Sequence, residues 1–143
     1  MPVDYACHRN GTYVRLTSHG VITDDELLSA VHLMYASDED TKHHRCALLD
    51  FSLVEQAEVS SDAVREIARL NLAASKLVAP GAPVALVAPL DHMYGLGRMW
   101  EVFVEGTGWQ TQVFKDLEEA KDWLEERLVA QRRSVDGAEG TNE

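Results

Sequence analysis

Residues 46–51 read CALLDF, a continuous apolar run that only Asp50 interrupts, and residues 83–89 read PVALVAP. A continuous apolar run of this length is typical of a strand that other elements cover on both faces, whereas a strand with one wet face alternates apolar and polar residues. Strands of this kind occur in parallel sheets, in which a crossover helix joins each strand to the next. The two runs therefore predict the centre of a parallel sheet in an α/β fold.

Helix signals flank both runs. Thr23 and Glu26 have the spacing of a capping box, and apolar residues then recur on one helical face as far as Tyr35. Ser60 and Asp116 are expected to cap two later helices. The charged stretch 38–45 is predicted to be a loop. Four helices are predicted on these grounds, over about residues 24–35, 60–77, 91–105 and 117–128.

The remaining strands lie nearer the chain ends. Alternating residues on both sides of Asn10-Gly11 predict an antiparallel hairpin, because a type I′ turn needs positive φ at both central positions. Gly20 is expected to end the second strand of this hairpin, and the alternating residues 109–114 to form the last strand. The predicted order is β-β-α-β-α-β-α-β-α, a mixed and mainly parallel sheet of about five strands with four helices.

One domain, residues 1–133, accounts for nearly the whole chain of 143 residues. Residues 134–143, SVDGAEGTNE, are small, polar and acidic, and predict a disordered tail. From residue 116 onward nine acidic and four basic residues contribute −5 to the formal net charge of −11. This segment is either an ordinary solvated surface or a surface that attracts a basic protein partner.

Composition excludes several classes of protein. The net charge of −11 argues against nucleic-acid binding, because phosphates would be repelled. The longest apolar stretch, residues 77–90, holds three prolines and is too short to span a membrane, and the first residues lack the features of a signal peptide. Cys7 and Cys46 match no metal or redox spacing and are expected to be buried, reduced thiols. These features predict a cytoplasmic protein.

Three segments carry a family resemblance: LLDFS at residues 48–52, VALVAP at 84–89, and DHMYGLGRM at 91–99. With the order of elements, they resemble the bacterial SpoIIAA-like group of STAS/SEC14-type domains over about residues 3–130. Relatives in this group usually carry alanine where this chain has Gly97. The resemblance implies a STAS-like fold and a role as an interaction or switch module.

The resemblance also implies a candidate phosphorylation site. In anti-anti-sigma factors, a serine at the start of the helix after the third strand is phosphorylated. Counted without gaps that position falls on Val59, and a slip of one residue places it on Ser60, next to Ser61. Ser60 is therefore either a phosphorylatable switch or a helix cap, whose hydroxyl accepts a hydrogen bond from a backbone amide.

Polar residues follow two of the predicted strands. Asp50 closes one strand, and Asp91, His92 and Tyr94 follow another, with Arg98 one helical turn beyond Tyr94. Ligands in open α/β sheets bind beyond the carboxyl ends of the strands, so these five residues are candidates for a small polar pocket. Arg98 would bind a carboxylate or phosphate there. Alternatively, the two aspartates cap local structure and Arg98 neutralises one of them.

We find no catalytic or metal-binding pattern in the sequence. Gly95-Leu96-Gly97 lacks the third glycine of a dinucleotide motif, since position 100 is Trp100, and no P-loop lysine follows. The six histidines show no metal-ligand spacing, and Cys46 begins a buried strand without a setting that lowers a thiol pKa. We therefore expect a protein that is not an enzyme and that needs neither cofactor nor metal.

Aromatic residues surround the third predicted helix. Trp100, Phe103 and Trp109 are expected either in the core or along an apolar groove for a partner or a lipid-like ligand. The sequence thus predicts a STAS-like interaction or regulatory domain that binds a protein partner or itself. The alternative is a module that binds a small apolar, lipid-like or acidic ligand in a pocket near Asp91–Arg98.

Overall fold

The computed structural model describes the backbone of residues 2–141 and the side chains of residues 2–133. Five strands form one sheet in the order β1-β2-β3-β4-β5. β1 and β2 are antiparallel, and every later neighbour is parallel. The predicted mixed, mainly parallel sheet is confirmed. The strands are β1 (Val3–His8), β2 (Tyr13–Thr23), β3 (Cys46–Glu58), β4 (Pro83–Val87) and β5 (Gln110–Phe114).

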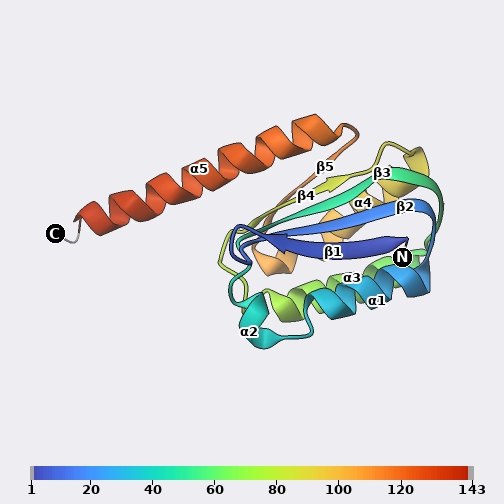
Figure 1. Ribbon diagram of the computed structural model, residues 1–143, viewed down its shortest axis with the longest axis horizontal. Helices are drawn as coiled ribbons and strands as arrows, with labels where there is room; N and C mark the ends of the chain where they lie inside the picture. Colours follow the sequence, from blue (N-terminus) through green and yellow to red (C-terminus); the bar gives the residue numbers. More distant parts are fainter. Residues whose placement is uncertain (1, 142–143) are drawn as a thin grey trace.

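The helices cover the two faces of the sheet unequally (Figure 1). Three long helices pack on one face, and of the described helices α5 alone lies on the other, where it contacts β3, β4 and β5. β1 and the outer side of β2 are therefore left without a covering helix on the α5 face. The helices are α1 (Asp24–Met34), α2 (Asp38–Thr41), α3 (Ser61–Ala74), α4 (Asp91–Phe103), the 3₁₀ turn η1 (Glu105–Thr107) and α5 (Leu117–Thr141).

Alternation along β3 divides the core into two layers. Leu48 points toward α5, while its neighbours Ala47 and Leu49 point toward α1, α3 and α4. The larger layer lies beneath the three helices, and the smaller one beneath α5, where Ala120 and Leu124 are completely buried. Residues 46–51 of β3 are covered on both faces for this reason, as the continuous apolar run predicts.

The hairpin between β1 and β2 turns one residue earlier than the sequence predicts. The amide of Gly11 donates to the carbonyl of His8 (3.1 Å), and the two residues between them, Arg9 and Asn10, have φ of 53° and 61°. Positive φ at both central positions is typical of a type I′ turn. Gly11 follows the turn with its own positive φ of 82°.

β2 and β3 continue further than predicted. Gly20 does not end β2: it lies at a shift of register with φ of 68°, and the strand continues to Thr23. β3 continues beyond Phe51 to Glu58, beside this end of β2. A bulge with glycine at positive φ interrupts the pattern of alternation without ending the pairing of the strands.

Three other expectations differ from the structure. A short helix, α2, forms in the predicted loop 38–45 because Ser37 caps it and accepts from the amide of Asp40 (3.2 Å). Helix α5 continues to Thr141, so residues 134–141 of the predicted disordered tail are helical, and residues 142–143 of that prediction lie outside the described residues. A started helix adds residues at small cost, so its glycines weaken the helix without ending it. Cys7 is exposed, and only Cys46 is the predicted buried thiol.

Candidate functional site

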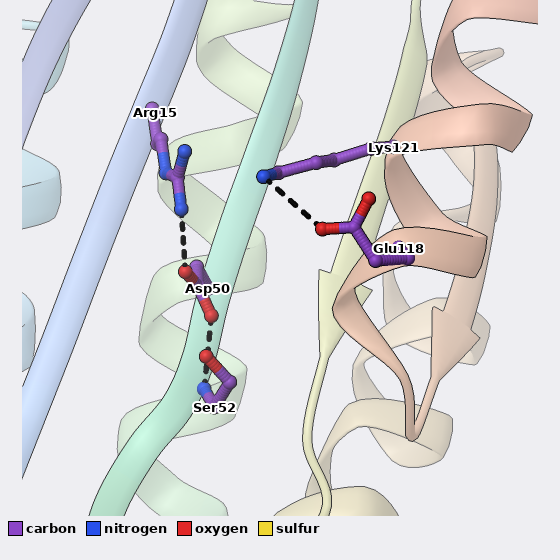
Figure 2. A network of polar contacts seen from close by, with 5 residues as sticks. All are labelled: Arg15, Asp50, Ser52, Glu118 and Lys121. Carbon is purple, nitrogen blue, oxygen red and sulfur yellow. Dashed lines mark hydrogen bonds and ion pairs between the residues drawn. The ribbon is translucent and has the colours of Figure 1, made fainter.

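Arg15 of β2 and Asp50 and Ser52 of β3 form a polar network (Figure 2). Asp50 lies on the α5 face of β3 and is 2% exposed. One of its oxygens accepts from the Arg15 guanidinium (2.8 Å), and the other accepts from the amide of Ser52 (2.9 Å). Burial alone would raise the pKa of Asp50, but its hydrogen bonds from Ser52 and Arg15 hold that pKa below the ordinary value. Asp50 is therefore an ionised, fully engaged carboxylate.

A groove of about 450 Å³ separates α5 from the first two strands beside this network. It contains three basic side chains, each paired with a carboxylate: Arg15 with Asp50, Lys121 with Glu118 at 3.6 Å, and Arg9 with Glu125. Figure 2 shows Lys121 reaching from α5 over β3. The groove is polar, and these carboxylates neutralise its three basic side chains, while the exposed Asp122 adds one further negative charge. Its lining residues are His8, Arg9, Tyr13, Arg15, Glu118, Lys121, Asp122 and Glu125.

Arg15 is the main residue that sequence reasoning missed. Its neighbours Val14 and Leu16 are buried on the opposite face of β2, so alternation alone places Arg15 on the α5 face. β2 also lies next to β3, where Thr17 is the register partner of Asp50. The alternating pattern around Arg15 predicts which face of the strand this side chain occupies. Its closeness to Asp50 depends on the register of β2 against β3, which the pattern does not give.

The five residues predicted to form one polar pocket occupy four places. Asp50 lies with Arg15 on the α5 face. Asp91 is exposed and pairs with Lys115 (2.8 Å), whose ammonium group also lies 5.0 Å from the centre of the Tyr94 ring. This hydrogen bond and the positive charge lower the pKa of Asp91.

The other two predicted pocket residues have partners of their own. Arg98 is exposed and lies 3.4 Å from Glu101, one turn along α4, rather than beside either aspartate. His92 lies with its Nε2 3.3 Å from the carbonyl oxygen of Val59, so it links the start of α4 to the end of the β3–α3 connection. Only Asp91 and Tyr94 are brought together, through Lys115.

Ser60 is the N-cap of α3 and also a link to α1. Its hydroxyl accepts from the amide of Ala63 (3.1 Å) and donates to Asp24 (2.6 Å), and its own amide donates to the other oxygen of Asp24 (2.7 Å). Asp24 is the first residue of α1. The cap predicted for Ser60 is confirmed. A phosphate at Ser60 would lie beside the Asp24 carboxylate, whereas Ser61 is an exposed residue in the first turn of α3.

An apolar cavity of about 50 Å³ lies beneath α4, between this helix, α1, α3 and the sheet. α4 contributes Met93, Leu96, Gly97 and Trp100 to its wall. The cavity is thus near the predicted pocket at Asp91–Arg98 but is lined by apolar side chains instead of the polar ones. The indole N–H of Trp100 donates a buried hydrogen bond to Asn71 (2.9 Å), which orients this side chain in the wall of the cavity.

A second groove, of about 320 Å³, runs between β1 and α1 at the edge of the sheet. Val3 and Ala30 form its buried floor, while Tyr5 and Leu33 are 39% and 56% exposed beside it. Sequence reasoning did not identify this groove, because it depends on which side of the sheet α1 covers. The lining residues are Pro2, Val3, Asp4, Tyr5, Asp25, Glu26, Ser29, Ala30 and Leu33.

The cysteines and histidines do not form a reactive or metal-binding cluster in the part of the chain that the structure describes. Burial raises the pKa of the Cys46 thiol to about 12, so the thiolate is not available near neutral pH. His44 is buried against the ring of Tyr35, and this burial lowers its pKa. Across residues 2–141, we find no helix with both the length and the apolar character that crossing a membrane requires.

Comparisons with known proteins identify the fold. No protein-family model matches the chain, and no curated protein matches its sequence. Among solved structures, it is similar to an uncharacterised protein of the DUF3478 family from Shewanella loihica PV-4, described as having a SpoIIAA-like fold. The sequences are 19% identical, the TM-score is 0.51, and the match covers 85% of this chain and 91% of that one. The chain therefore has the SpoIIAA-like α/β fold that its sequence motifs suggest.

Proposed function

We propose that this chain is a non-enzymatic, STAS-like domain that acts in the cytoplasm by binding a protein partner. The observation that carries the proposal is the open edge of the sheet. β1 pairs with β2 on one side and with no other strand among the described residues, and Tyr5 and Leu33 expose apolar surface beside it. Open edges and exposed apolar surface are features through which proteins associate. Two cysteines that form no disulfide agree with a reducing compartment.

The polar residues support binding rather than catalysis. Asp50 is held ionised by Ser52 and Arg15, and the thiol of Cys46 is held protonated by burial. A general base or nucleophile needs a pKa matched to its task and a partner within reach of a substrate. Asp50 is instead bonded to Arg15 on β2 and Ser52 on β3, and Cys46 is packed in the core beneath α5.

Site-directed photo-crosslinking in the cells that produce this chain tests the proposal. A photoreactive phenylalanine analogue at Tyr5 or Leu33 is expected to give a discrete cross-linked protein. The same analogue at Arg132, an exposed residue far along α5, serves as the matched control. Equal cross-linking at Tyr5, Leu33 and Arg132, or no cross-linked protein at any of these positions, contradicts the proposal.

The apolar cavity beneath α4 suggests a second function to be tested. A module for a small apolar or lipid-like ligand needs an apolar space, and this one, at about 50 Å³, is smaller than the 150 Å³ or so that admits benzene in an engineered cavity. Ligand entry would require α4 to move away from the sheet. Native mass spectrometry of the freshly purified protein separates the two functions: a bound acyl-sized mass supports the ligand, and the bare chain of 15.9 kDa argues against it.

A further inference from the structure

The hydrogen bonds of the first hairpin define which groups of β1 are left open. The amide of His19 donates to the carbonyl of Pro2 (2.9 Å), so these two residues face each other as a hydrogen-bonded pair. Hydrogen-bonded and non-bonded pairs alternate along an antiparallel ladder. Val3, Tyr5 and Cys7 are therefore the residues whose backbone N–H and C=O groups point away from β2, toward the open edge. A strand of six residues with three such positions can pair with another extended chain.

The groove beside this edge is acidic as well as apolar. Asp4, Asp25 and Glu26 line it, and no lysine, arginine or histidine does. The groove beneath α5 differs in this respect, because each of its three basic side chains is paired with a carboxylate of the same protein. The β1–α1 groove thus leaves a local negative charge that a basic group of a binding partner would neutralise.

Charge also decides between the possible occupants of the edge. A second copy of this chain, paired β1 to β1 about a two-fold axis, would bring two acidic grooves and two chains of net charge −11 together. An extended segment that carries lysine or arginine meets the same edge with opposite charge. Its apolar residues would contact Tyr5 and Leu33 beside the buried floor of the groove.

We propose that the open edge of β1 binds an extended, basic segment of a partner protein as a sixth strand of the sheet. The inference rests on the proposed function and names its surface and the chemistry of its partner. Backbone hydrogen bonds to Val3, Tyr5 and Cys7 supply the pairing, and the carboxylates of Asp25 and Glu26 on α1 select lysine and arginine. Because exposed charges are screened by salt, binding weakens as ionic strength rises.

The test uses a synthetic heptapeptide of alternating lysine and valine, blocked at both ends, and the ¹⁵N-labelled full chain. We expect amide shifts along β1 and α1 in NMR spectra, and slower hydrogen exchange at the amides of Val3, Tyr5 and Cys7 on binding. A peptide with glutamate in place of lysine is expected to bind at least tenfold more weakly. Equal binding of the two peptides, or shifts confined to another surface, overturns the proposal.

A matched pair of variants isolates the backbone contact. Cys7→Pro removes an outward N–H group without removing a hydrogen bond to β2, whereas Cys7→Ala changes the side chain and keeps the N–H group. We expect Cys7→Pro to weaken peptide binding about tenfold, the effect of one lost hydrogen bond, and Cys7→Ala to leave it unchanged. The double variant Asp25→Asn, Glu26→Gln tests the charge independently, with Glu55→Gln on β3 as its control.

The outcomes separate this inference from the proposed function. A cross-linked partner whose binding Cys7→Pro and the charge variants leave unchanged overturns the sixth strand but retains an interaction domain. A dimer in sedimentation experiments that Cys7→Pro dissociates assigns the edge to a second copy and also overturns the inference. The absence of any cross-linked protein contradicts the proposed function, while the peptide experiment still reports whether the edge accepts a basic strand.

Discussion

At the scale of single residues, Ser60 has the most clearly defined structural role. Its hydroxyl caps α3 and bonds to Asp24 at the start of α1, so one side chain stabilises the starts of two helices. We expect Ser60→Ala to lower the free energy of unfolding by about 1–2 kcal/mol. Urea denaturation measures this change. Ser61→Ala is the control: its exposed side chain should change stability by less than about 0.5 kcal/mol, and equal effects of the two would contradict the capping role.

The Asp50–Arg15 pair gives a prediction that depends on pH. Asp50→Asn keeps the shape of the side chain but leaves the half-buried Arg15 without its counter-charge, and should destabilise the fold by about 2 kcal/mol at pH 7. Ser52 and Arg15 lower the pKa of Asp50 in the folded protein. The stabilisation by Asp50 is therefore fully present above the unfolded-state pKa of about 3.9, and is lost as the pH falls through the lower folded-state value.

Urea denaturation of both proteins between pH 7 and pH 2 checks this prediction. The difference in stability between the original chain and Asp50→Asn should be constant from about pH 7 to about pH 5 and then shrink on acidification. Asp122→Asn, an exposed residue of the α5 groove, should show little difference at either end of the range. A difference for Asp50→Asn that grows in acid would contradict an ionised Asp50.

At the scale of elements, the two glycines of α4 make a matched pair. A Cβ atom at Gly95 would meet nothing within 4 Å, so Gly95→Ala should stabilise the protein by about 1 kcal/mol through helix propensity. A Cβ atom at Gly97 would lie 3.1 Å from Leu86 and 3.2 Å from Val113. Leu86 lines the apolar cavity and can shift into it, so Gly97→Ala should gain less than Gly95→Ala. Thermal unfolding of both variants ranks them, and a larger gain at Gly97 would contradict the close packing of α4 on the sheet.

Local sequence patterns predicted the elements of this chain better than their ends. The capping residues Thr23, Ser60 and Asp116 start helices as expected, because a cap is a contact between near neighbours in the sequence. Gly20 was expected to end a strand, but β2 continues to Thr23 because residues 21–23 pair with the end of β3. The outcome at Gly20 depended on a partner strand far away in the sequence, which a local pattern does not include.

The candidate site was harder to predict for the same reason. Asp50 was identified from its strand, but its partner Arg15 lies 35 residues earlier and is brought to it by the register of β2 against β3. Asp91 and Arg98 lie two helical turns apart on α4. Asp91 pairs with Lys115, and Arg98 pairs with Glu101. Proximity in sequence therefore identified residues of the right chemistry without showing which of them meet.

At the scale of the whole molecule, α5 is the only helix on its face of the sheet among residues 2–141, and Figure 1 shows it running past the strands toward its C-terminal end. Its fully buried contacts come from Ala120 and Leu124, in its first turns. Gln131 adds a hydrogen bond to the carbonyl of Gly81 (3.1 Å). All three residues precede 134, so we expect the fold to be complete in residues 1–133.

A chain shortened to residues 1–133 should therefore melt within about 2 °C of the full chain, a change in stability below about 0.5 kcal/mol. Leu124→Ala in the full chain is the contrasting variant, and should cost about 2–5 kcal/mol because it leaves a cavity beneath α5. Differential scanning calorimetry compares the three proteins. A fall of more than about 5 °C for the shortened chain would mean that residues 134–143 stabilise the domain.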